Sequence, residues 1–179
     1  AGFWNGVVAE FSTSACLSKT QMKNEKYINA MFFDESTDRL LISMEPPGYL
    51  SAGKFHPFAS DGTKSLKGDF IRLRNGEMLN ASINGLYKVK DDSLFLWSSL
   101  KQRANCVIER PDGKFILGTN SGVYLLNEQG NILSLFHPIF KDVRVDDIEK
   151  RDDLYFFATR GKGLVIVEGD SAYKVDESD

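Results

Sequence analysis

Short apolar runs separated by polar turns make up most of this 179-residue chain. One such run spans residues 115–119; a turn at Asp112-Gly113 precedes it, and Ser121-Gly122 leads from it into another apolar run. Asp-Gly and similar pairs accept the positive φ angles that tight hairpins require. No segment of ten or more residues shows the apolar spacing of three and four that marks an amphipathic helix. The pattern therefore predicts short antiparallel strands joined by hairpin turns.

The same pattern returns about every 40 residues, which is the period of a blade-like repeat. A glycine opens one apolar strand of each copy, and the five glycines lie 42, 37, 37 and 41 residues apart, at Gly6, Gly48, Gly85, Gly122 and Gly163. A strand–turn–strand segment precedes each of the last four glycines, with predicted strands at 28–33 and 40–43, 70–73 and 78–82, 106–108 and 115–119, and 145–148 and 155–159. A further turn and a short last strand follow each glycine strand, with the turns at Asp61-Gly62, Asp91-Asp92, Gln129-Gly130 and Gly169-Asp170.

Four short antiparallel strands in about 40 residues form one blade of a β-propeller. The sequence therefore predicts an all-β chain with four complete four-stranded blades plus half a blade. The expected boundaries are 1–27 for the half blade and 28–67, 68–103, 104–143 and 144–179 for the complete blades. Because propellers usually close with four to eight whole blades, we expect an incomplete ring or a fragment. An open ring exposes sheet faces and an edge, so we also expect self-association or marginal stability.

One repeat is longer than the others. Gly48 and Asp61 are 13 residues apart, whereas the equivalent stretch that starts at Gly85 is six residues long. Insertions in repeat proteins often lie on one face and carry binding function. We therefore predict a ligand-contacting loop here, with candidate binding residues Tyr49, Lys54, Phe55 and His56; the alternative is a longer hairpin that packs its own Phe side chains.

The small residues before the glycine turns have a structural interpretation. Blades converge on a central axis, where strands are crowded. Ala81, Gly118 and Ala158 would suit close approach there. The two cysteines, Cys16 and Cys106, are too few for a disulfide framework and are expected to be buried thiols.

Charge and motif content exclude several functions. A net charge of -3 argues against nucleic acid as a partner, and with no apolar stretch long enough to span a bilayer the chain would meet a membrane only through a parent protein. His56 and His137 fall at different phases of the repeat, so no metal site or cofactor is predicted. The acidic pairs, such as Asp34-Glu35 and Asp91-Asp92, sit beside turns and are interpreted as solvated or turn-capping carboxylates. No catalytic residue is predicted.

Residues 105–128 resemble the repeat of the two-component regulator propeller family. That repeat has a strand ending in Trp-Ile-Gly-Thr followed by Gly-Gly-Leu-Tyr, and here residues 115–119 and 121–124 occupy those places, with Phe115 at the aromatic position. The resemblance implies an extracytoplasmic, periplasmic sensor propeller of a histidine kinase or hybrid two-component system, often responding to polysaccharides. It implies no enzymatic activity in this segment.

Three functional hypotheses follow. The first is a non-enzymatic, ligand-sensing propeller segment with a small-molecule or oligosaccharide ligand. The alternatives are a generic protein-interaction propeller and a propeller lyase or glycosidase acting at the central funnel.

Overall fold

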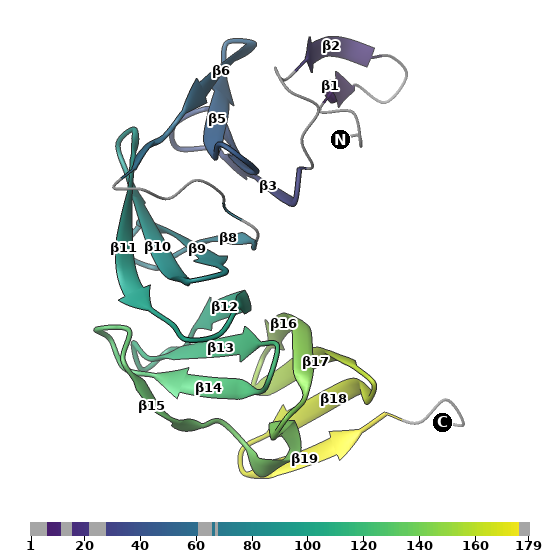
Figure 1. The fold of residues 1–179 in the computed structure, drawn as a ribbon. Helices are drawn as coiled ribbons and strands as arrows, with labels where there is room; N and C mark the ends of the chain where they lie inside the picture. The colour runs from purple at the N-terminus through teal and green to yellow at the C-terminus, as the bar shows by residue number, and fades with distance from the viewer. Residues whose placement is uncertain (1–6, 12–15, 22–27, 61–65, 67, 176–179) are drawn as a thin grey trace.

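The computed structural model describes residues 7–11, 16–21, 28–60, 66 and 68–175, and these form an all-β, four-bladed propeller arrangement (Figure 1). Strands β1 (Val7–Phe11) and β2 (Cys16–Gln21) pair into a separate two-stranded sheet. Blade 1 consists of β3 (Ala30–Asp34), β4 (Arg39–Ser43), β5 (Gly48–Ser51) and β6 (Lys54–Pro57). The prediction of four complete four-stranded blades and a two-stranded part is confirmed.

Blades 2 to 4 repeat the antiparallel order of blade 1, with the first strand at one edge. The fourth strand lies at the other edge in blades 3 and 4, whereas in blade 2 a further short strand lies outside it. Blade 2 contains β8 (Phe70–Arg72), β9 (Met78–Ser82), β10 (Gly85–Lys90) and β11 (Ser93–Ser99). Blade 3 contains β12 (Ala104–Glu109), β13 (Phe115–Thr119), β14 (Val123–Leu126) and β15 (Ile132–Leu135), and the short 3₁₀ helix η1 (Pro138–Phe140) follows it. Blade 4 contains β16 (Arg144–Arg151), β17 (Leu154–Arg160), β18 (Gly163–Glu168) and β19 (Ser171–Lys174).

The sheets lie along an open arc in Figure 1, with the first strands β3, β8 and β12 toward its concave side and β11 and β15 on its outer side. The predicted turns have the expected backbone. Gly76 and Gly113 take φ angles of 86° and 81° between the first and second strands of their blades, which is the left-handed region that glycine adopts without strain.

Blade 1 differs from its prediction. Residues 49–58 do not form an inserted loop. They include the regular third and fourth strands, β5 and β6, joined by a two-residue turn in which Ala52 and Gly53 have φ angles of 48° and 72°. The expected turn at Asp61-Gly62 lies outside the described residues. The additional length supplies β7 (Ala59–Ser60), which pairs in parallel with β11 and so gives blade 2 a fifth strand.

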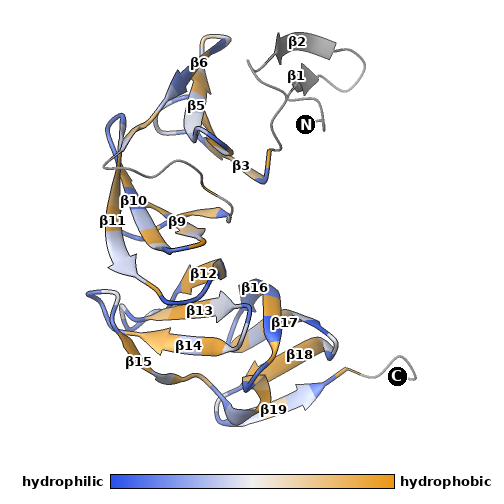
Figure 2. Ribbon diagram, viewed as in Figure 1, coloured by the Kyte–Doolittle hydropathy of each residue, from blue (hydrophilic) through white to orange (hydrophobic). Residues whose placement is uncertain are grey.

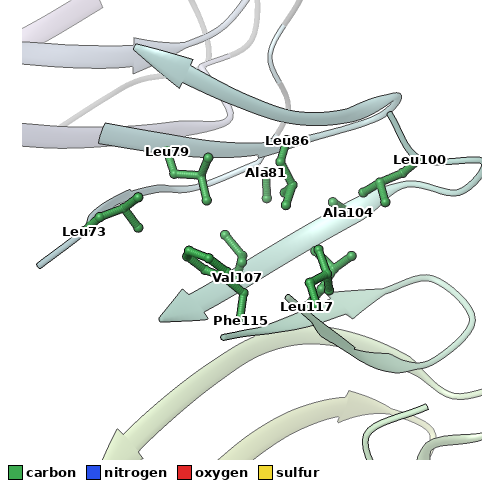
Figure 3. Packing of buried hydrophobic residues seen from close by; sticks show 10 residues of the cluster. Leu73, Leu79, Ala81, Leu86, Leu100, Ala104, Val107, Phe115 and Leu117 are labelled. Atoms are coloured by element: carbon green, nitrogen blue, oxygen red, sulfur yellow. The ribbon is translucent and has the colours of Figure 1, made fainter. Parts of the chain in front are cut away.

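Apolar side chains fill the spaces between blades. In Figure 2, hydrophobic colour follows strands such as β12, β14 and β18, whereas the turns are hydrophilic. The cluster between blades 2 and 3 is shown in Figure 3, where Leu79 and Leu86 face Val107 and Leu117 across the gap. These four side chains are at most 2% exposed, so the neighbouring sheets are held together by dry packing.

The expected close approach holds for two of the three small residues. A Cβ added to Gly118 would meet the Cys106 sulfur and come within 3.3 Å of Val145 and Ile148 of the next blade, and Ala81 is fully buried. The prediction is wrong for Ala158, which is exposed because blade 4 is the last sheet that the structure describes.

Cys106 is a buried free thiol, as predicted, and burial raises its pKa above the ordinary range. The side chain of Cys16 lies outside the described part. No helix among the described residues is long and apolar enough to cross a membrane.

Candidate functional site: the cleft between blades 1 and 2

A cleft of about 350 Å³ opens between blade 1 and blade 2. Its walls come from the end of β3, the start of β4, the β8–β9 turn and the turn before β11. Leu41, Met78 and Val89 give it an apolar floor. The volume lies within the range of small-molecule sites, and an apolar floor with a few oriented polar groups is their usual composition.

Asp34 forms one polar wall. It ends β3 and is 5% exposed, and its carboxylate accepts hydrogen bonds from the backbone N–H of Ser36 at 3.0 Å and from the Ser36 hydroxyl at 2.7 Å. The Arg72 guanidinium reaches across from blade 2 and forms an ion pair with the same carboxylate oxygen. Burial raises the pKa of Asp34, but the hydrogen bonds from Ser36 and Thr37 together with Arg72 outweigh it, so the pKa lies below its usual value and the group is ionised.

Asp92 forms the opposite wall. Its Oδ1 accepts a hydrogen bond from the Tyr49 hydroxyl at 2.9 Å and pairs with Arg39 Nη1 at 2.8 Å. The hydrogen bond from Tyr49 and the charge of Arg39 lower the pKa of Asp92, while burial and the hydrogen bond to Asp92 raise the pKa of Tyr49. The Arg39 guanidinium also lies 4.3 Å from the centroid of the Tyr49 ring. The three groups therefore hold one another in a fixed orientation, since a planar guanidinium can stack and donate at once.

The candidate residues from the sequence are distributed over both faces of the β5–β6 hairpin. Tyr49 and His56 are cross-strand neighbours with ring centroids 5.1 Å apart, and Tyr49 is 5% exposed within the cluster that joins blades 1 and 2. Phe55 packs on a different cluster, that of Ile42 and Met44. Lys54 is exposed at the start of β6. The structure thus brings Tyr49 together with His56 and separates Phe55 from them.

Sequence reasoning missed the residues that make the cleft. The sequence pattern indicates Asp34 and Asp92 only as turn carboxylates. Asp34 does cap its turn, but it also pairs with Arg72, 38 residues away. Equivalent strand ends of adjacent blades lie side by side. A charged residue at a strand end of one repeat and an opposite charge on a strand of the next repeat are therefore the sequence signal for an ion pair between blades.

The charge of the cleft is net negative. Four carboxylates (Asp34, Glu77, Asp91 and Asp92) and two guanidiniums (Arg39 and Arg72) line it, which gives a formal balance of -2. Such a surface disfavours anionic ligands. Within the described ranges, no three His, Cys, Asp or Glu side chains are grouped as a metal ion would need.

Comparison with known proteins identifies relatives by structure only. No protein-family model and no curated protein matches the chain. The extracellular domain of the hybrid two-component system BT3049 from B. thetaiotaomicron superimposes with a TM-score of 0.70 at 15% identity, over 88% of this chain and 23% of that domain. This chain therefore has the fold of part of that extracellular domain.

Two further solved structures superimpose on this chain. PorZ, a surface component of the type-IX secretion system of Porphyromonas gingivalis, matches with a TM-score of 0.73 at 16% identity, over 99% of this chain and 32% of PorZ. Virginiamycin B lyase from Staphylococcus aureus matches with a TM-score of 0.71 at 8% identity, over 96% of this chain and 64% of the lyase. The chain spans about a quarter to two thirds of these proteins, and the likeness establishes the fold alone.

Proposed function

We propose that this chain is part of an extracytoplasmic, non-enzymatic sensor propeller that binds an uncharged, polyhydroxylated ligand, such as an oligosaccharide, in the cleft between blades 1 and 2. The observation that carries the proposal is the pair of ionised carboxylates, Asp34 and Asp92, each held by a guanidinium above an apolar floor. The likeness to the BT3049 extracellular domain supports an extracytoplasmic sensor, and so does the repeat resemblance.

Sugar chemistry suits these groups. A carboxylate accepts and a guanidinium donates, so each ion pair offers both partners that neighbouring hydroxyl groups require, and such charge-assisted hydrogen bonds are the stronger kind. Leu41, Met78 and Val89 provide apolar surface for the C–H face of a pyranose. The net negative lining makes a sulfated or uronic polysaccharide the poorer ligand.

The position of the cleft between two blades suggests how ligand binding would be transmitted. Because its two walls belong to different blades, a ligand that bridges Asp34 and Asp92 would bind differently when the blades are closer together or farther apart. A ligand shifts a conformational equilibrium only through such differential contacts. The junction between blades 1 and 2 is therefore the element whose geometry would report binding.

Acid catalysis is the less favoured role for this cleft, even though a lyase shares the fold. A general acid needs a pKa raised toward neutrality. The pKa values of Asp34 and Asp92 are both lowered, so neither carries a proton to give at neutral pH.

The test is calorimetric titration of the chain with neutral oligosaccharides derived from starch, xylan, mannan and fructan, and with heparin and polygalacturonate as anionic probes. A neutral oligosaccharide is expected to bind, and Arg72→Gln and Asp92→Asn are expected to weaken it at least about tenfold, since each charge-assisted bond contributes roughly 1.5–3 kcal/mol.

Matched controls decide whether the cleft is the site. Arg160→Gln removes an exposed guanidinium paired with Asp146 in blade 4, and Phe55→Ala changes the other face of the β5–β6 hairpin. Both should leave binding unchanged. Binding of the anionic probes alone, or a neutral ligand that is insensitive to Arg72 and Asp92, would overturn the proposal.

A further inference from the structure

The outermost strands of the four blades differ in how their free edges are protected. An unprotected edge strand presents unpaired N–H and C=O groups to other chains, and proteins usually block it with lysine, proline, a bulge or a covering segment. The outer strands of blades 1 and 4 each contain a lysine, Lys54 in β6 and Lys174 in β19, and β6 also ends in Pro57. The outer strands of blades 2 and 3, β11 and β15, contain no charged residue and no proline.

Blade 2 covers its edge with its own chain. The segment β7 pairs in parallel with the first residues of β11, with Ala59 opposite Ser93 and Ser60 opposite Leu94. The backbone N–H of Ala59 also donates to the Asp92 carbonyl at 2.8 Å. An extended segment is therefore already seated on one outer edge of this propeller, in the geometry of strand addition.

Blade 3 has no such cover among the described residues, because β15 is the last strand of its sheet. Ile132 and Leu133 are 46% and 51% exposed on it, and Figure 2 shows the strand in hydrophobic colour. The strand has a bulge, since Leu126 pairs with Ile132 while Leu125 pairs with Ser134. A bulge also interrupts the pairing of β11, where β7 nevertheless binds on the residues before it.

A groove of about 560 Å³ adjoins the same edge. It runs between the end of β11 and the β14–β15 turn, with Trp97, Leu100 and Ile132 as apolar lining. The polar lining residues are uncharged except for Lys101. The Ser98 hydroxyl donates to the Gly130 carbonyl at 2.6 Å and fixes the two walls together. The groove is large enough to accept the side chains of a bound strand.

We propose that β15 is a docking edge for an extended, uncharged segment of a partner protein, which adds to blade 3 as β7 adds to blade 2. Backbone hydrogen bonds to β15 would supply affinity. Apolar side chains at alternate positions of the segment would contact Ile132 and Leu133 and enter the groove beside Trp97. This site is on the outer rim and is separate from the cleft between blades 1 and 2.

The experiment selects octapeptides from a displayed random library on the immobilised chain and titrates fluorescein-labelled selected peptides by anisotropy. We expect saturable binding by peptides with alternating apolar residues, lost when central amides are N-methylated. Leu133→Lys should weaken binding at least about tenfold, because burying a Leu against a partner contributes roughly 1.5–3 kcal/mol, which corresponds to that factor.

Leu164→Lys is the matched control, since it places the same charge at a 39% exposed leucine on β18, inside a sheet rather than at its outer edge. It should bind the peptides as the unmodified chain does. The proposal is overturned if no selected peptide depends on Leu133, or if N-methylated peptides bind equally well. It is also overturned if sedimentation shows a dimer that Leu133→Lys dissociates, because the occupant of the edge is then a second copy of this chain.

Discussion

The junction between blades 3 and 4 and the junction between blades 1 and 2 are built from different chemistry. Phe140 of η1 is fully buried between blades 3 and 4, and its ring centroid lies 4.4 Å from that of Phe157. Valine and isoleucine side chains surround the pair. The junction between blades 1 and 2 also has an apolar cluster, but Tyr49 belongs to it, and two inter-blade ion pairs line an open cleft beside it.

The two kinds of junction are expected to differ in rigidity. Close-packed apolar side chains have no alternative partner of comparable energy, so a junction made of them keeps one geometry. The charged groups of an ion pair at a cleft can replace their contact with each other by contacts with water or with the hydroxyl groups of a ligand, and the net change in free energy is small. The junction between blades 1 and 2 is therefore expected to change its geometry when a ligand binds. The junction between blades 3 and 4 is expected to hold the arc together.

The largest expected effect is at the apolar junction. Phe140→Ala should lower the free energy of unfolding by about 3–5 kcal/mol, because it removes a fully buried ring and leaves a cavity. Urea unfolding followed by circular dichroism measures it. Phe33→Ala, at a 54% exposed position of β3, is the control and should change stability by no more than about 0.5 kcal/mol. Equal losses in the two variants would contradict the role given to Phe140.

The next effect tests the crowding at blade 3. Gly118→Ala should cost about 1–3 kcal/mol, because the added methyl group overlaps the Cys106 sulfur and presses on Val145 of the next blade. Ala158→Val, at the equivalent position of blade 4, adds more volume to an exposed site and should be nearly neutral. If both substitutions prove neutral in thermal unfolding, the contact between β13 and β16 is looser than the structure has it.

Substitutions at the polar junction between blades 1 and 2 should lower the free energy of unfolding by less. Arg72→Gln leaves the buried Asp34 carboxylate without its cation, and the expected loss is about 1–2 kcal/mol, since Ser36 still donates to it. The double variant Asp34→Asn/Arg72→Gln should recover part of this loss, which a double-mutant cycle in urea measures. Strict additivity of the two single variants would mean that the ion pair contributes nothing to stability.

The smallest effect is the dependence on pH. The folded-state pKa of Asp34 is lowered from its ordinary value of 3.8. The stability that its ionised form contributes is therefore present above that value and is lost as the pH falls through the lower, folded-state pKa. The difference in unfolding free energy between the unmodified chain and Asp34→Asn should accordingly shrink as the pH is lowered below about 4. A difference that stays constant down to the acid limit would show that the pKa is not lowered.

Most of the fold follows from local pattern. The predicted second strands at 78–82 and 115–119 coincide with β9 and β13, because a short apolar run that follows an Asn-Gly or Asp-Gly turn specifies a hairpin without help from distant residues. The sequence predicts the strands of blade 1 less well. Its third and fourth strands turn at Ala52-Gly53, a pair with weaker turn preference than the Asp61-Gly62 that follows, and the parallel contact of β7 with β11 has no local signal at all.

The sequence by itself thus determined the repeat, the strand order within a blade and the small residue at Gly118, since each depends on neighbours along the chain. Only the tertiary structure decided the cleft. Asp34 meets Arg72, and Arg39 meets Asp92, because two blades pack side by side and bring together strand ends that are 38 and 53 residues apart in the chain. Charge pairing of that kind depends on the angle and distance between sheets, which is set by the apolar side chains packed between them.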